Sequence, residues 1–211
     1  MTSSLNYYFS AESHTQCVSY TSILIIIVLY LLSTHVAGTA CGAQYGVSDN
    51  CTLCAVKVFN ATGHGTVGGA IAGIDHVVSQ CTNATTGGSR CVVNLSLTSK
   101  YVQSFDTSVA NAVAKGVVMV VAAGNNASDA CVNTSPASTA SAFTVGATSI
   151  TDKRSSFSNW GKCVDVYAPG SSIISASIDD STASTTKSGT SMASPRECQC
   201  DFSVHSLTQG V

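Results

Sequence analysis

Charged residues are scarce in this chain. They make up 9% of its 211 residues, and the formal net charge is −2. A protein that binds nucleic acid needs a basic surface, and no cluster of Lys or Arg is present to form one. The longest apolar run, Ile23 to Leu32, falls well short of the roughly 20 residues that a membrane-spanning helix needs. We therefore expect no nucleic-acid partner and no stable membrane span.

The run from Ile23 to Leu32 has two interpretations. It could be the apolar core of a secretory signal peptide, but no Lys or Arg precedes Lys57, so the usual basic region before such a core is missing. It could equally be a strand buried in a folded domain. The sequence alone leaves both interpretations open.

Cysteine, by contrast, is abundant. The chain has 10 cysteines, and Cys51-x-x-Cys54 has no second pair at the spacing of a zinc site. Glycosylation sequons begin at several asparagines, although the sequon of Asn94 falls in an expected buried strand. Cysteines and sequons together predict a secreted, extracellular protein with disulfide bonds. The other sequons begin at Asn50, Asn60, Asn83, Asn126 and Asn133.

The pattern of apolar residues predicts alternating strands and helices. Residues 117–123 are apolar without interruption, as in a parallel strand that helices cover on both faces. Strand and helix in alternation predict an α/β fold with a parallel sheet between helices and functional loops at the carboxyl ends of the strands. The other expected strands are 53–59, 91–97, 142–148 and 164–167, and the expected helices are 70–78 and 104–115.

Two short segments carry candidate chemistry. Ser191 stands among small residues in Ser188 to Pro195, where an irregular segment should enter a helix. A hydroxyl at a helix N-terminus can act as a nucleophile, because nearby amides stabilise negative charge. Asn125 follows the apolar strand, from which its amide could donate to an oxyanion. Taken alone, the segment around Ser191 is equally consistent with an ordinary turn, and for Asn125 alone an ordinary turn is the better interpretation.

Four segments together resemble the subtilisin-like serine proteases, particularly the proteinase K branch. Their order and spacing fit that family between Thr34 and Pro195. The resemblance implies a three-layer α/β sandwich and an endopeptidase that cleaves polypeptides through an acyl-enzyme. The segments are Thr34 to Thr39, Val121 to Asn126, Arg154 to Gly161 and Gly189 to Pro195.

The resemblance assigns a role to individual residues. Ser191 matches the nucleophile and Asn125 the side-chain oxyanion donor, and no cofactor is needed for catalysis. Asp165, with carbonyls near Ala140 and Ala142, matches a structural calcium site. Cys131 and Cys163 match a pair that is bridged by a disulfide in some relatives. We also expect the protein to be a monomer. Positions that match the substrate-binding groove are Gly63, Gly65, Ser96, Leu97, Ala122, Ala123 and Gly124, with Thr98 where the family usually has glycine.

The departures from the family concern the triad. Leu32 occupies the position of the catalytic histidine, and His35 matches a second, non-catalytic histidine. The orienting aspartate should precede the histidine motif, but the first aspartate of the chain is Asp49. His64 resembles the lost motif locally, yet its position after a strand places it on the substrate-binding edge.

These departures divide the chain into three expected parts. They are a divergent segment 1–32 with the short apolar run, a partial peptidase domain 33–195 and a divergent tail 196–211. The abrupt changes at Leu32 and Arg196 favour a truncated or mis-spliced chain. The polar tail predicts loss of the helix that should follow Ser191, and with it poor stability.

Removing the base from a family member lowers turnover by about 10⁶. The chain should therefore be nearly inert as a protease. The alternative is a non-catalytic protein that keeps the peptide-binding groove.

Overall fold

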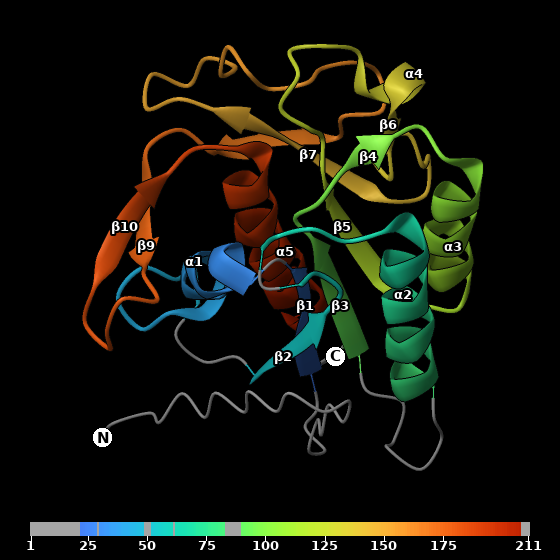
Figure 1. The fold of residues 1–211 in the computed structure, drawn as a ribbon, viewed down its shortest axis with the longest axis horizontal. Coiled ribbons are helices and arrows are strands. Elements are labelled where there is room, and N and C mark those ends of the chain that lie inside the picture. The colour runs from blue at the N-terminus through green and yellow to red at the C-terminus, as the bar shows by residue number, and fades with distance from the viewer. Residues whose placement is uncertain (1–21, 29, 49–51, 61, 83–89, 208–211) are drawn as a thin grey trace.

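A six-stranded parallel sheet forms the centre of the computed structural model (Figure 1). The structure describes residues 22–28, 30–48, 52–60, 62–82 and 90–207. The strand order is β2-β1-β3-β5-β7-β8. The strands are β1 Ser22–Val28, β2 Thr52–Lys57, β3 Arg90–Leu95, β5 Val118–Ala122, β7 Phe143–Thr148 and β8 Val166–Pro169.

Helices cover both faces of this sheet. Figure 1 shows α2 (Val67–Cys81) beside α3 (Gln103–Ala114), and α1 (Tyr30–Cys41) beside α5 (Thr190–Leu207). The remaining elements lie in the connections between these layers. They are β4 Ser99–Lys100, α4 Ala130–Asn133, β6 Thr134–Ser135, β9 Ile173–Ala176 and β10 Ser184–Lys187.

Side-chain alternation along the inner strands builds two apolar layers. In β5, Met119 and Val121 pack with the layer under α2 and α3, whereas Val120 packs with the layer under α1 and α5. Successive residues of a strand point to opposite faces, so an uninterrupted apolar run fills both layers. The predicted α/β three-layer architecture is confirmed, as are the expected strands and helices between residues 53 and 167.

The apolar run that the sequence left open, Ile23 to Leu32, is divided between two elements: its first part lies in the strand Ser22–Val28, and Tyr30 to Leu32 begin α1. This strand, β1, pairs in parallel with β2 on one side and β3 on the other. The sheet therefore includes residues from the segment 1–32. Among the described helices, none is long and apolar enough to cross a membrane.

The expected loss of a helix after Ser191 is wrong. Helix α5 continues to Leu207, beyond the change at Arg196. Its early turns supply the apolar contacts, because Met192, Ala193 and Cys198 are buried in the layer shared with α1. The helix therefore forms despite its polar tail, since these three buried side chains pack it against the sheet and α1.

The cysteines and sequons are distributed as follows. Disulfide bonds join Cys81 to Cys91 and Cys131 to Cys163, and the second is the expected pair. Asn94 is fully buried in β3, as expected for its sequon, whereas Asn60, Asn126 and Asn133 are exposed. Asn50 and Asn83 lie outside the described residues.

His35 joins α1 to the hairpin of β9 and β10. Its side chain is buried and its Nε2 lies 3.0 Å from the Ile173 carbonyl oxygen, while the His35 carbonyl accepts the Ser175 hydroxyl at 2.9 Å. Burial, and then the nearby positive charge of Lys187, lower the pKa of His35, although backbone hydrogen bonds to Ile173 and Thr185 oppose this.

This lowered pKa predicts a pH dependence of stability. On acidification the unfolded chain binds a proton at His35 before the folded chain does, so the free energy of unfolding should fall below about pH 6.5. His35→Gln keeps a donor for Ile173 but does not titrate, so it should flatten this dependence. Urea unfolding between pH 5 and 7.5 measures it, with exposed His76→Gln as control. Equal slopes for both variants would contradict the prediction.

Candidate active site

Ser191 lies at the start of α5, against the end of β3. Its side chain is partly buried, and its Oγ donates to the Ser96 carbonyl at 3.2 Å. One turn later, Pro195 has no N–H, so the Ser191 carbonyl lacks its usual helical partner. The Ser96 hydroxyl donates to that carbonyl at 2.9 Å instead. Ser96 therefore holds both the side chain and the backbone of Ser191.

A closed ring of buried polar side chains supports this contact. Asn94 Nδ2 donates to Ser96 Oγ at 2.8 Å, and Ser194 Oγ donates to Asn94 Oδ1 at 2.7 Å. The hydroxyl oxygens of Ser96 and Ser194 lie 3.1 Å apart and close the ring as a contact, since each hydroxyl gives its one proton to another acceptor. All three residues are almost fully buried. Buried polar groups are tolerated when each finds a partner, so this ring fixes the end of β3 against the first turns of α5.

Asn125 is joined to the other side of the same helix start. Its Oδ1 accepts the Thr190 N–H at 2.8 Å and the Thr190 hydroxyl at 3.0 Å. Thr190 Oγ1 in turn accepts the Gly124 N–H at 3.1 Å. Because both donors point at Oδ1, they fix which end of the amide faces Thr190. The exposed Asn125 side chain therefore directs its NH2 group away from Thr190.

The other residues predicted to line the substrate-binding groove lie in two places. One is the ends of strands β5 and β3, and the other is the turn between β2 and α2. Ala122 ends β5, and Ala123 and Gly124 follow it, all three buried. Leu97 follows Ser96 after β3 and is also buried, with Thr98 exposed beside it. Gly63 and Gly65 lie in the turn between β2 and α2, where Gly65 bridges Phe59. The structure thus brings Ser191, Ser96 and Asn125 together and keeps the Gly63–Gly65 edge on a separate loop.

None of the histidines whose side chains are described bonds to Ser191. His35 is engaged with Ile173, and His64 Nδ1 lies 3.1 Å from Thr62 Oγ1 in an exposed turn. His76 is exposed on α2. Leu32, at the position of the family's base, lies in the first turns of α1 and packs against the α1–α5 layer. Position 32 therefore offers hydrocarbon contact and no proton acceptor.

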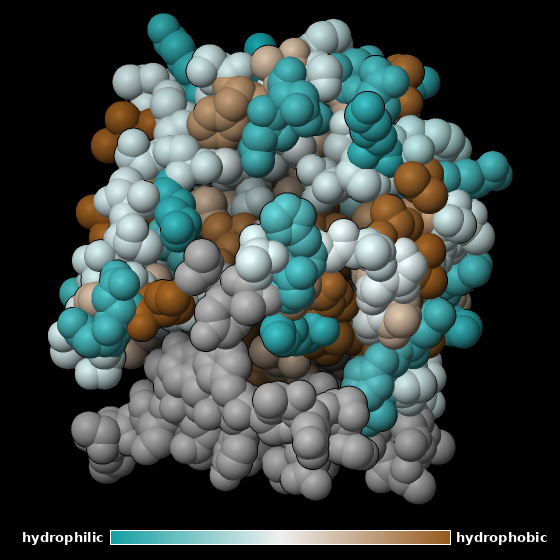
Figure 2. Space-filling model, viewed as in Figure 1, coloured by the Kyte–Doolittle hydropathy of each residue, from teal (hydrophilic) through white to brown (hydrophobic). Residues whose placement is uncertain are grey.

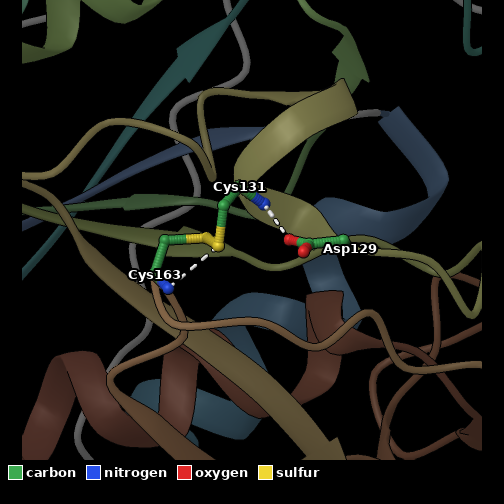
Figure 3. A group of neighbouring side chains, drawn as sticks. All are labelled: Asp129, Cys131 and Cys163. Carbon is green, nitrogen blue, oxygen red and sulfur yellow. Dashed lines mark hydrogen bonds between the residues drawn. A yellow bond between two sulfur atoms is a disulfide. The ribbon is translucent and has the colours of Figure 1, made fainter.

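Asp165 is exposed at the start of β8, facing β7. Its Oδ2 accepts the Thr144 N–H at 2.7 Å, and its own N–H donates to the Thr144 carbonyl at 2.9 Å. The carboxylate is thus held beside the segment that carries Ala140 and Ala142. Another group, Asp129, Cys131 and Cys163, is compact enough to suggest a metal site. Figure 3 shows why it is not one: the two sulfurs bond to each other, and Asp129 caps the Cys131 N–H.

Sequence reasoning missed Thr190, Asn94 and Ser194. Thr190 lies within the motif and could have been proposed as a cap, since threonine often accepts or donates at a helix start. Ser194 lies in the same motif, but nothing in the sequence pairs it with Asn94, because the two residues lie 100 positions apart and meet only in the fold.

Comparison with known proteins gives a consistent result. The model of the Subtilase family matches residues 33–199. An extracellular serine proteinase of Thermus sp. (strain Rt41A) is 48% identical over 77% of this chain and 38% of its own length. Cerevisin of Saccharomyces cerevisiae is 44% identical over 77% of this chain and 26% of its own length. This chain thus spans less than half the length of these relatives.

A solved structure supports the same assignment. The crystal structure of a cold adapted subtilisin-like serine proteinase superposes with a TM-score of 0.82 and 34% identity, over 97% of this chain and 82% of that one. Sequence and fold agree on one family, and its members need no catalytic cofactor. The chain belongs to the subtilase family.

Proposed function

We propose that this chain carries the nucleophile and the substrate-binding half of a secreted subtilisin-like serine endopeptidase, and that it is nearly inert as it stands. One observation carries the proposal. Asn125 Oδ1 accepts the N–H of Thr190, the residue before Ser191, so the Ser191 hydroxyl and the Asn125 amide flank the same helix start. A nucleophile beside an amide donor is the arrangement that acyl transfer requires.

In the proposed reaction, Ser191 Oγ attacks the carbonyl carbon of a peptide bond and its proton passes to a base. The resulting oxyanion is stabilised by the Asn125 amide and the Ser191 N–H. Cleavage of the carbon–nitrogen bond releases the amine and leaves an acyl-enzyme, which water hydrolyses. With Leu32 at the position of the base, no base among the described side chains is placed to take the proton of Ser191, which is donated to the Ser96 carbonyl. The cost of losing the base in a family member, about 10⁶ in turnover, is roughly 8 kcal/mol.

The proposed substrate is an extended polypeptide. Its backbone would lie between the strand end at Ser96 and Leu97 and the turn at Gly63 and Gly65. Ala122, Ala123 and Gly124 would form one wall of the pocket for the side chain before the cleaved bond. Thr98, exposed where the family usually has glycine, adds bulk to this groove. Low charge suits a groove that recognises backbone, and Figure 2 shows residues of intermediate hydropathy over much of one face.

Extracellular location and a monomeric state complete the proposal. The disulfides of the chain suit an oxidising compartment. The Thermus relative is an extracellular proteinase by name.

The second candidate is a non-catalytic peptide-binding protein. It is favoured by the Ser191 hydroxyl, which donates to the Ser96 carbonyl and has no histidine partner among the described side chains. Both candidates require the same groove and expect an unreactive Ser191 in this chain. They differ in whether peptide binding is itself the function or the retained half of an endopeptidase.

Reactivity of Ser191 is tested with a fluorophosphonate probe, which labels activated serines. The chain should show no labelling above a Ser191→Ala control, because no base removes the hydroxyl proton. Mass spectrometry of the peptide that contains Ser191 gives the readout. Specific labelling of Ser191 would refute the inertness that both candidates share and would indicate a catalytically active endopeptidase.

The groove is tested separately by peptide binding. Titration of the ¹⁵N-labelled chain with an extended, uncharged peptide should shift the amide resonances of Leu97, Gly63 and Gly65 together, since a peptide backbone laid between these two segments changes the surroundings of their N–H groups. Thr98→Gly should tighten binding by widening the groove, with Thr107→Gly on α3 as the control. Absence of shifts at both edges at millimolar peptide would rule out the groove and both candidates.

We further propose that Asp165 and neighbouring carbonyls hold a structural calcium ion. An oxygen-only set of one carboxylate and backbone carbonyls fits a hard cation, and Thr144 already orients the carboxylate. Calcium should raise the melting temperature of the chain, magnesium should not, and Asp165→Asn should remove the calcium effect. Exposed Asp75→Asn is the control. An equal calcium effect in Asp165→Asn would place the ion elsewhere.

A further inference from the structure

The loop that carries Asn125 lies along a second segment, residues 157–163. This segment belongs to the motif around Trp160, to which the proposed reaction assigns no part. Four backbone hydrogen bonds join the Asn125 loop to residues 157–163, so this segment fixes the backbone path of the loop. They run from Ala127 N–H to Phe157, from Asn159 N–H to Gly124, from Trp160 N–H to Ser128 and from Ala130 N–H to Trp160, at 2.8 to 3.1 Å.

The side chain of Asn159 reaches into the loop and binds it on both sides of Asn125. Its Oδ1 accepts the N–H groups of Asn126 at 2.9 Å and Ser128 at 3.1 Å. Its Nδ2 donates to the Ala123 carbonyl at 2.9 Å and to Thr134 Oγ1 at 3.2 Å. Asn159 is fully buried, so water cannot replace these bonds.

Only an amide of this length meets all of these partners. Asparagine offers two donors on one end and an acceptor with two lone pairs on the other, and the loop presents two acceptors and two N–H groups to match. The approach is so close that a Cβ on Gly124 would lie 2.4 Å from Asn159 Nδ2. Gly124 also has a φ of +103°, which side chains disfavour. Gly124 and Asn159 are therefore complementary.

We propose that Asn159 is a positioning residue for Asn125. It does not touch the proposed substrate. It holds the backbone before and after Asn125, while Thr190 holds the Asn125 side chain, so the NH2 group of Asn125 has one direction. This inference rests on the proposed function in one respect: the direction of the Asn125 NH2 group matters because that group is the proposed oxyanion donor. The geometry that it asserts can be tested without any catalytic activity.

Other contacts hold the far end of the same loop. The Cys131–Cys163 disulfide and the Asp129 cap lie where the loop enters α4 (Figure 3). Gly161 packs so closely there that a Cβ would lie 2.5 Å from Asp129 Oδ1. Loss of Asn159 should therefore loosen residues 123–128 without releasing the rest of the segment.

Amide hydrogen exchange, followed by NMR on the whole chain, tests this. Asn159→Ala should speed exchange of the Asn126 and Ser128 amides about tenfold or more, because each loses its buried acceptor. Asn159→Asp keeps the acceptor oxygen for those two amides but loses the donor to the Ala123 carbonyl, so their protection should fall less than in Asn159→Ala. Asn133→Ala removes an exposed amide side chain beyond the loop and should change neither.

The side-chain NH2 resonances of Asn125 give a second readout. They should broaden or merge toward free-amide values in Asn159→Ala, but not in Asn133→Ala, because only the first variant releases the loop. Unchanged exchange at Asn126 and Ser128 in a folded Asn159→Ala chain would overturn the proposal. So would loss of protection in β5 and β7 in both Asn159 variants, which would show a global role. Failure of peptide binding would count against the proposed function only.

Discussion

A single missing N–H group organises the site. Pro195 cannot donate to the Ser191 carbonyl, and a buried carbonyl without a partner costs about 1–3 kcal/mol. The Ser96 hydroxyl supplies the partner at 2.9 Å. That hydrogen bond joins the end of a central strand to the first turn of α5. The helical hydrogen bond that Pro195 cannot make is thus replaced by one that holds Ser191 against the sheet.

From this contact, hydrogen bonds extend in both directions. Asn94 and Ser194 close the buried ring behind Ser96, and Thr190 connects the helix start to Asn125. Asn159 then fixes the loop on either side of Asn125. In a buried, fully paired network each bond depends on its neighbours, so Ser191 and Asn125 are held as one unit. No member of this unit is a triad histidine or aspartate, and its geometry does not depend on them.

The sequence predicted the layers better than the site. Strands that fill two apolar layers have a visible pattern, and the run 117–123 identified β5. The helix after Ser191 was missed because the residues beyond Pro195 are polar, whereas Met192, Ala193 and Cys198 are what anchor it. The ring could not be predicted, because Asn and Ser at distant positions carry no pattern and pair only once β3 and α5 meet. Motifs found Ser191 and Asn125 because each is local.

The strand β1 completes the sheet without any of the side chains that the proposed reaction uses. A central strand contributes backbone hydrogen bonds to both neighbours, and β1 pairs with β2 and β3 along its length. Those bonds do not depend on the identity of the side chains, so an apolar run without an aspartate completes the sheet as well as any other sequence. Catalysis depends instead on particular side chains. Leu32 packs in the apolar layer between α1 and α5. Under the proposed function, it leaves Ser191 without the base that the reaction requires.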